Sequence, residues 1–266
     1  VWACPVKMCN DGSGDHVSVN YKLCIGCGQC LTACIHGARY GIDDFGAFMQ
    51  DLKKGTKMIA IVAPAVSVSF KGKDLELNGW LQSLGVEAFF DVSFGAELTT
   101  KSYVEHLKKN NPKLVIAQPC PALVSFCEMY RPNLLKYLAP ADSPMGHIMK
   151  MIRRYYPQYK DYKIAVISPC YAKRREFDET GLGDYNVTMK SIESYLRATQ
   201  TKLSSFPKVK YINPVAERGV GYSTPGGLMH TAERFVPGIS AQTRKIEGHP
   251  EIIEYFVQLG KSMDKG

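Results

Sequence analysis

Short, continuous apolar segments alternate with longer amphipathic stretches over much of the chain. Four apolar segments have the length of strands buried on both faces, and they span 58–62, 88–92, 113–117 and 162–167. Between them, apolar residues recur at helical spacing, which predicts helices over 42–54, 78–85, 99–110, 122–128 and 146–156. Strands that alternate with helices predict an α/β fold with a mainly parallel sheet.

The pattern is weaker in the last third of the chain. It predicts helices over 189–199, 228–235 and 250–263, and a strand over 209–212. A glycine-rich stretch over 221–227 precedes the second of these helices. Since no segment approaches eighteen consecutive apolar residues, we expect no membrane span.

The composition is that of an ordinary globular protein. Of 266 residues, 45% are hydrophobic and 22% are charged, which is enough for one large or two medium domains. The formal net charge is +8, but the basic residues are scattered and no aromatic residues are interleaved with them. Nucleic-acid binding is therefore not indicated. The basic residues indicate a solvated face or a docking surface for an acidic electron-transfer partner.

A cysteine-rich segment over 22–39 carries the strongest chemical signal. Cys24, Cys27, Cys30 and Cys34 have the C-x2-C-x2-C-x3-C spacing with which bacterial ferredoxins hold 4Fe-4S clusters. Gly26 and Gly28 allow the backbone to curl around a cluster. A zinc knuckle, the alternative, normally has two separated C-x2-C pairs. We therefore predict a ferredoxin-like domain over 1–54 and a second domain over 55–266.

The fourth cysteine of such a segment normally ligates another cluster, so Cys34 is expected to point away from the first. Cys4, followed by Pro5, resembles the final Cys-Pro of a preceding motif and is our candidate for the missing ligand. One 4Fe-4S cluster, on Cys4, Cys24, Cys27 and Cys30, is predicted, and a second involving Cys34 stays open. A cysteine directly before Val1 would complete the preceding motif, so we expect the chain to begin inside a two-cluster domain.

Six of the nine cysteines lie in the first 34 residues, at cluster spacing. This distribution indicates thiolates that stay available to iron, and so the reducing cytoplasm of an anaerobe. Cys9 has no assigned partner, and a small buried thiol is its simplest interpretation.

Two further cysteines follow predicted strands. Cys120 and Cys170 each lie in a Pro-Cys pair at the end of a strand, where ligands bind in parallel sheets. Lys173 and Glu176 fall on one face of the helix that begins there. A lysine at a dry metal pocket can bind an anionic ligand. Two ordinary core cysteines are the alternative.

Over about 59–234 the chain resembles the catalytic domain of the FeFe-hydrogenases, preceded by that family's ferredoxin-like domain. The resemblance lies in six stretches, which occur in the family's order and at comparable spacing. They are APAVSVSF (63–70), FFDVSFGAELT (89–99), PCPALVSFCEMYRPNLL (119–135), SP (143–144), SPCYAKRREFDE (168–179) and GYSTPGGLM (221–229).

The resemblance implies an H-cluster, which is a 4Fe-4S cubane bridged to a di-iron azadithiolate subsite with CO and cyanide. Cys120 then resembles the first cubane ligand and Cys170 the second. Lys173 resembles the lysine that bonds an iron-bound cyanide. The walls around the di-iron ligands are implied at Pro64, Ala65, Gly226 and Gly227.

The chain departs from the family along the implied proton route. Pro119 stands where the family has a proton-passing cysteine, and Ser168 stands where it has a methionine. Glu176 alone keeps a carboxylate. On the resemblance, Tyr103 and His106 (or Glu105 after a one-residue slip) stand at the family's glutamate positions, and Ala139 stands at its serine position. Losing one positioned acid/base group slows catalysis by roughly 10²–10⁴. These positions therefore resemble a sensory or regulatory branch of the family.

The implied function is reversible conversion of H2 and protons at a low rate, in hydrogen or redox sensing. Its partner would be an electron-transfer protein such as ferredoxin or a downstream signalling domain, and a homo-oligomer stays open. The family supplies two further cubane ligands after the Gly-Gly helix, but no cysteine follows Cys170. We therefore expect the protein to continue beyond Gly266, and read 260–266 as a linker. The alternatives are a non-catalytic iron-sulfur protein, resembling the Nar-type cluster-assembly relatives, or a plain electron-transfer module.

Overall fold

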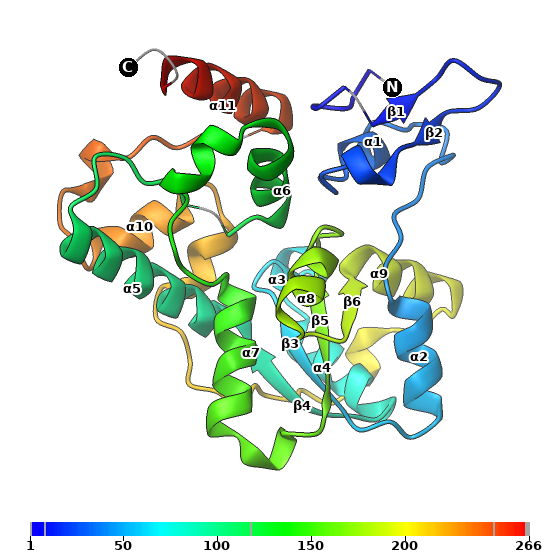
Figure 1. The fold of residues 1–266 in the computed structure, drawn as a ribbon. Helices are drawn as coiled ribbons and strands as arrows, with labels where there is room; N and C mark the ends of the chain where they lie inside the picture. Colours follow the sequence, from blue (N-terminus) through cyan, green and yellow to red (C-terminus); the bar gives the residue numbers. More distant parts are fainter. Residues whose placement is uncertain (1, 8, 118, 247, 264–266) are drawn as a thin grey trace.

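A four-stranded parallel sheet forms the core of the larger, lower part of the molecule in Figure 1, below the cysteine segment, α6 (Pro121–Tyr130) and α11 (His249–Met263). The computed structural model describes residues 2–7, 9–117, 119–246 and 248–263, apart from the side chain at 249. The strands lie in the order β4-β3-β5-β6, with β3 (Met58–Val62), β4 (Val86–Asp91), β5 (Lys163–Ser168) and β6 (Tyr185–Thr188). Each neighbouring pair is parallel, which confirms the α/β fold.

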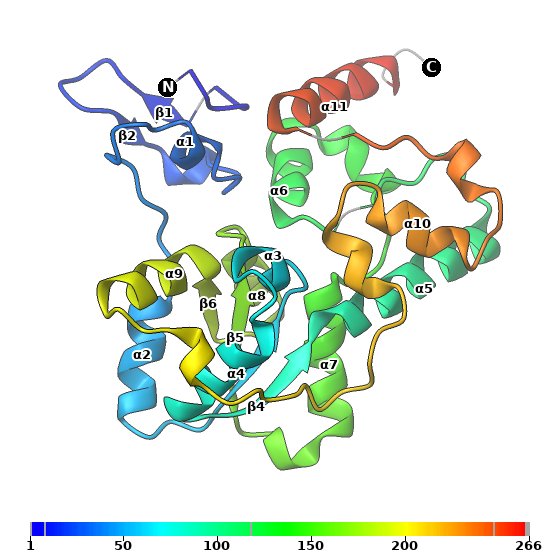
Figure 2. The same cartoon turned by 180° about the vertical axis from the view of Figure 1, so that it is seen from behind.

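Helices cover both faces of this sheet. Figure 1 shows α7 (Pro144–Tyr155) and α8 (Lys173–Thr180) in front of the sheet. Figure 2 shows α4 (Asp74–Ser83) and α9 (Met189–Ala198) in front of the opposite face. This double cover explains the continuous apolar sequence of β3, in which every residue is buried.

The strand order reverses between β3 and β5. From β3 the chain moves outward to β4, and from β5 it moves outward in the other direction to β6. The carboxyl ends of β3 and β5 therefore flank the crevice where parallel α/β sheets bind ligands. The segments that follow these two strands are 63–65 and 169–172.

The chain between the strands packs around this framework. Helix α2 (Phe45–Lys53) lies against β6, where the rings of Phe48 and Tyr185 are 6.0 Å apart. Helix α5 (Val92–Asn110) packs closely on α7, because a Cβ at Gly95 would lie 2.1 Å from the Pro144 carbonyl oxygen. Short helical segments fill the rest: α3 (Val66–Ser69), η3 (Pro157–Tyr159), η4 (Leu203–Ser205), η5 (Gly219–Ser223) and η6 (Ile239–Gln242).

A second, smaller apolar cluster joins the cysteine-rich segment to the helices beside it. Its buried members are Ile25, Ile116, Phe126, Cys127, Leu134 and Phe256. Ile25 comes from the cysteine segment, Ile116 from segment 113–117, and the others from α6, η2 (Pro132–Tyr137) and α11. The N-terminal part also contains β1 (Asn10–Asp11), β2 (Ser18–Val19), η1 (Tyr21–Leu23) and α1 (Gln29–Thr32). Helix α10 (Gly227–Glu233) packs against α5. Both figures place α6 between the cysteine segment and α11.

Two predicted strands are wrong. Segment 113–117 makes one isolated bridge, between Ile116 and Leu138, because it leaves the sheet to enter the second apolar cluster. Gln118, at its end, lies outside the described residues. Segment 209–212 runs extended beside α4 and β4, with single bonds from the Val209 and Ile212 N–H groups to the carbonyls of Leu75 and Phe89.

Two further features differ from what the sequence predicts. The sheet has an unpredicted edge strand, β6. The linker expected over 260–266 is wrong as far as Met263, where α11 ends, and 264–266 lie outside the described residues. The domain boundary at 54/55 stays a prediction.

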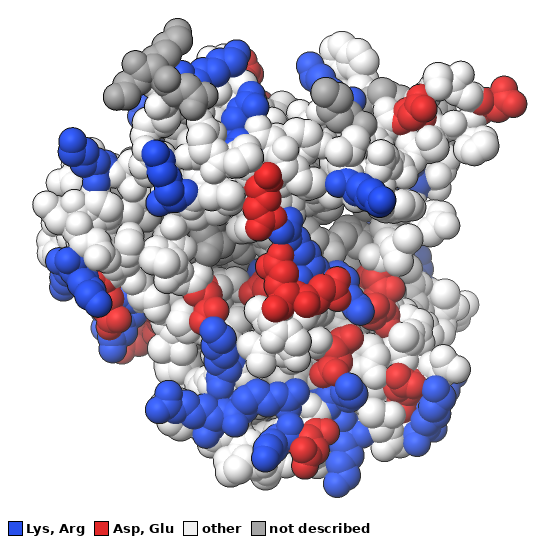
Figure 3. Space-filling view, in the orientation of Figure 1, with Lys and Arg blue, Asp and Glu red and all other residues white. Residues whose placement is uncertain are grey.

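Acidic and basic side chains are interspersed on the surface (Figure 3), and they meet over α8 near the centre of that view. Arg174 pairs there with Asp44 at 2.8 Å, and Arg175 pairs with Glu179 at 2.6 Å. In the described part of the chain, no helix is long and apolar enough to cross a bilayer.

Candidate metal centres

Five cysteine thiols gather around the cysteine-rich segment. The sulfurs of Cys4 and Cys9 lie 3.3 Å apart, and Cys24 is an electrostatic neighbour of both Cys9 and Cys27. Burial, and after it the neighbouring thiols of Cys24, Cys4 and Cys30, raise the pKa of Cys27 to about 11. Bound iron would stabilise the thiolates that burial and mutual repulsion disfavour.

The backbone of this loop has the form that a cluster requires. Gly26 and Gly28 have φ values of +71° and +78°, where a side chain would be strained. The Gly26 N–H donates to the Cys24 sulfur at 3.4 Å. Such N–H···S bonds stabilise the charge of an iron-sulfur cluster.

These residues fit a 4Fe-4S cluster, which would supply one-electron transfer, on Cys4, Cys24, Cys27 and Cys30. Among the described residues, no three Cys, His, Asp or Glu side chains converge on a site for a metal ion. The ligand assignment stays a prediction. Sequence reasoning missed the place of Cys9 beside Cys4, since its spacing matches no cluster motif.

Cys34 is the last cysteine of the segment. Burial acts to raise the pKa of its thiol, but the N–H groups of Ala38, His36 and Arg39 together outweigh burial and lower it. The groups that act on Cys34 thus belong to its own loop. Its part in a second cluster stays a prediction.

The second candidate centre lies at the reversal point of the sheet. Pro64 and Ala65 follow β3, and the bond from the Ala63 N–H to the Ile167 carbonyl (2.9 Å) holds that turn beside the end of β5. Cys170 follows β5. This end of the sheet therefore carries four of the predicted site residues, Pro64, Ala65, Ser168 and Cys170.

Cys120 reaches this centre by a different route from the one predicted. It does not follow a strand but is the N-cap of α6, directly before Pro121. Burial raises the pKa of the Cys170 thiol, the nearby Cys120 raises it further, and Lys173 opposes both. Cys120, Cys170 and Lys173 are therefore close enough to interact.

Lys173 is buried at the start of α8. Its Nζ donates to Glu176 Oε2 at 2.9 Å and to the Pro119 carbonyl at 3.4 Å. Glu176 also accepts a bond from Ser143, the N-cap of α7. Lys173 and Glu176 thus share one helix face, as their spacing predicts. Their catalytic roles stay predictions, as does that of Pro119.

Ser168 and the glycine pair shape the backbone around these elements. The Ser168 Oγ accepts from the Cys170 N–H at 3.2 Å and so holds the turn after β5. Gly226 has φ +74°, and a Cβ at Gly227 would lie 2.0 Å from the Gly221 carbonyl oxygen. The close neighbours of this pair lie in its own loop, α10 and Lys245. Its role at the di-iron ligands stays a prediction.

A cavity of about 220 Å³ lies beside Glu176, which lines it. It lies between α6, α7 and α8. Polar and apolar side chains line it, namely Pro119, Pro121, Val124, Leu138, Ala141, Asp142, Ser143, Arg175, Glu176, Glu179 and Thr180.

The two candidate centres are in direct contact. A Cβ at Gly26 would lie 3.1 Å from the Cβ of Ala172, and one at Gly41 would lie 2.2 Å from the Tyr171 ring. The cysteine loop therefore rests on the segment that follows Cys170. Sequence reasoning missed Gly41, Tyr171 and Ala172, because nothing in a motif indicates a contact between distant segments.

Known protein families match both the cysteine-rich segment and the larger α/β part of the chain. Residues 56–260 match the family described as iron only hydrogenase large subunit, C-terminal domain, and 16–38 match a 4Fe-4S binding domain. An NADP-reducing hydrogenase subunit of Solidesulfovibrio fructosivorans is 26% identical over 80% of this chain and 42% of its own. The cytosolic Fe-S cluster assembly factor NAR1 of Yarrowia lipolytica is 26% identical over 58% of this chain and 35% of its own.

Among solved structures, a variant of the FeFe-hydrogenase HydA1 of Chlamydomonas reinhardtii superposes with a TM-score of 0.59. It is 23% identical, over 73% of this chain and 57% of that one, and so supports the fold. The chain spans about two-fifths of the length of the curated relatives it matches. Because the family match covers most of the residues, the chain belongs to the family of the iron-only hydrogenase large subunit, C-terminal domain.

Proposed function

We propose that this chain is an electron-transferring iron-sulfur protein built on the hydrogenase fold, without rapid hydrogen turnover. Its redox centre would be the cluster on Cys4, Cys24, Cys27 and Cys30. The contact of the cysteine loop with Tyr171 and Ala172 carries the proposal. Through that contact an electron would pass between this cluster and the centre at Cys120 and Cys170. Similarity to a relative named as an iron-sulfur cluster assembly factor favours a role outside hydrogen catalysis.

The residues around Pro119 argue against rapid catalysis. A proline side chain has no proton to transfer, and the Pro119 carbonyl accepts a bond from Lys173. A lost acid/base group of this kind costs roughly 10²–10⁴ in rate.

A second candidate function is hydrogen conversion at a low rate, with H2 and protons as substrates and hydrogen or redox sensing as its purpose. Lys173 favours it. The residue is 6% exposed beside two thiols, and a buried ammonium is costly unless it meets an anion. The Glu176 carboxylate supplies one such anion. An H-cluster cyanide would be a further acceptor.

The iron-sulfur chemistry bears on the cellular compartment and the partners of either function. Free thiols at cluster spacing favour a reducing compartment, and we propose the cytoplasm. The formal net charge of +8 would attract an acidic electron-transfer protein such as a ferredoxin, and a downstream signalling domain is the other partner we propose.

Infrared spectroscopy distinguishes the two functions. The protein is expressed without oxygen, loaded with iron and sulfide, and then exposed to a synthetic di-iron azadithiolate complex. A 4Fe-4S signal without CO or cyanide bands would support electron transfer. Protein-bound bands that shift under hydrogen, and that change in Lys173→Gln, would overturn that proposal in favour of the hydrogenase. Glu179→Gln is the control, since Glu179 lies on the same helix and pairs with Arg175.

A further inference from the structure

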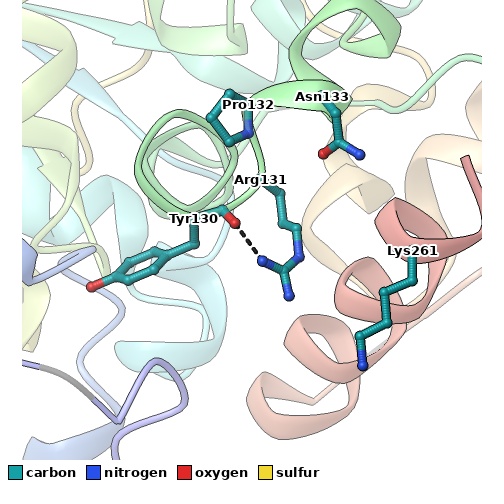
Figure 4. Close-up of a pocket in the computed structure, with 5 residues that line it drawn as sticks. All are labelled: Tyr130, Arg131, Pro132, Asn133 and Lys261. Carbon is teal, nitrogen blue, oxygen red and sulfur yellow. Dashed lines mark hydrogen bonds between the residues drawn. The ribbon is translucent and has the colours of Figure 1, made fainter. Parts of the chain in front are cut away.

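A cavity of about 360 Å³ lies between the end of α6, η2 and α11. It borders the cysteine-rich segment, because the hydroxyl of its lining residue Tyr130 donates to the Leu23 carbonyl at 2.7 Å. Tyr130, Arg131, Pro132, Asn133 and Lys261 line it (Figure 4). The side chains of Arg131 and Lys261 reach toward the same space from opposite walls. Its volume falls within the range of about 300–1,000 Å³ that is typical of small-molecule sites.

The cavity is rich in donors that carry positive charge. Arg131 uses one terminal nitrogen to bond the Tyr130 carbonyl at 2.6 Å, while its buried Nε has no partner among the described residues. In the described part of the chain, Lys261 makes no ion pair and no acidic side chain lines the cavity. Among the described residues, two cations thus face one space without a counter-charge, and a buried unpaired N–H is costly.

We propose that this cavity binds the phosphate group of a small phosphorylated molecule. The planar guanidinium of Arg131 can donate two parallel bonds to phosphate oxygens. Lys261 would add a second positive charge. Two cations match a phosphate, which carries a charge of about −1.5 to −2 at pH 7, better than a single carboxylate.

The bound phosphate would also connect two segments of the chain. Asn133 already donates to the Gly260 carbonyl at 3.1 Å, and a Cβ at Gly260 would lie 3.1 Å from Arg131 Cδ. These contacts hold η2 and α11 together beside the cavity, and a phosphate bound to both Arg131 and Lys261 would add a further link between them. This site does not depend on the proposed electron-transfer function.

Isothermal titration of the whole chain with inorganic phosphate tests the proposal. Saturable binding is expected, weakened on the order of tenfold or more by Arg131→Gln and by Lys261→Gln, because each loses a charge-assisted bond. Acetate, a monoanion, should bind at least tenfold more weakly than phosphate.

Lys136→Gln is the matched control, since Lys136 lies on η2 but does not line the cavity. It should bind phosphate as the unchanged protein does. Because Lys261 is exposed, Lys261→Gln should fold normally even if Arg131→Gln does not. Absence of saturable phosphate binding, equal binding of acetate, or undiminished binding by Lys261→Gln would each overturn the proposal.

Discussion

The contact between the cysteine loop and the segment after Cys170 can be tested with one methyl group. Gly26 faces Ala172 across this contact, and Gly26→Ala would place a Cβ 3.1 Å from the Ala172 Cβ and 3.3 Å from its Cα. Carbon atoms pack best at about 3.5–4.0 Å, so the loop must move away. Gly28→Ala is the matched control, because its Cβ would meet only the edge of the Tyr171 ring at 3.9 Å.

The two substitutions share one cost, and Gly26→Ala carries a second. Both glycines have positive φ, and an alanine in that region costs about 1 kcal/mol. Gly26→Ala adds the overpacking against Ala172, which costs about 1–2 kcal/mol where the neighbour is backbone and Cβ. We therefore expect a loss of about 2–3 kcal/mol in Gly26→Ala and about 1 kcal/mol in Gly28→Ala.

Urea titration of the iron-loaded protein, followed without oxygen by the loss of iron-sulfur absorption, measures both variants. Gly26→Ala should lose its cluster at a clearly lower urea concentration than Gly28→Ala. Equal midpoints in the two variants would refute the contact and, with it, the electron path we propose.

Three further predictions concern single side chains. Glu176→Gln should destabilise the fold by about 3 kcal/mol in chemical denaturation, because it leaves buried Lys173 without its anion. Glu179→Gln, whose side chain is 51% exposed, should cost below about 1 kcal/mol, and equal losses would contradict this account. Burial lowers the pKa of His147 below its usual 6.5, so the unfolded chain binds more protons and stability falls as the pH drops below about 6.5. His147→Gln should reduce that loss in pH-dependent melting, and an unchanged profile would count against it. Cys4→Ser should lower the iron content of the N-terminal cluster whereas Cys9→Ser should not, and the reverse result would make Cys9 the ligand.

Much of the sheet follows from local sequence. Strands β3, β4 and β5 have apolar central residues because helices cover both faces of the sheet, and in β3 every residue is buried. Edge strand β6 escaped prediction because its four residues, YNVT, are short and half polar. Segment 113–117 has the same apolar character as a strand, but its Ile116 is buried in the second cluster instead.

The candidate centres were predictable to the extent that motifs define them. The spacing of Cys24, Cys27 and Cys30, and the pairing of Lys173 with Glu176, are local properties. The place of Cys9 and the contact of Gly41 with Tyr171 depend on tertiary packing, which no local pattern encodes. The cavity at Arg131 likewise arises only when α11 returns to η2.

A spectroelectrochemical titration of the iron-loaded chain, carried out without oxygen, tests the central proposal most directly. We predict reversible one-electron reduction of a 4Fe-4S cluster that is lost in Cys27→Ser and kept in Cys34→Ser, with a reduced form that does not release hydrogen. A chain that shows no reversible reduction, or whose reduced form rapidly evolves hydrogen, would contradict the account.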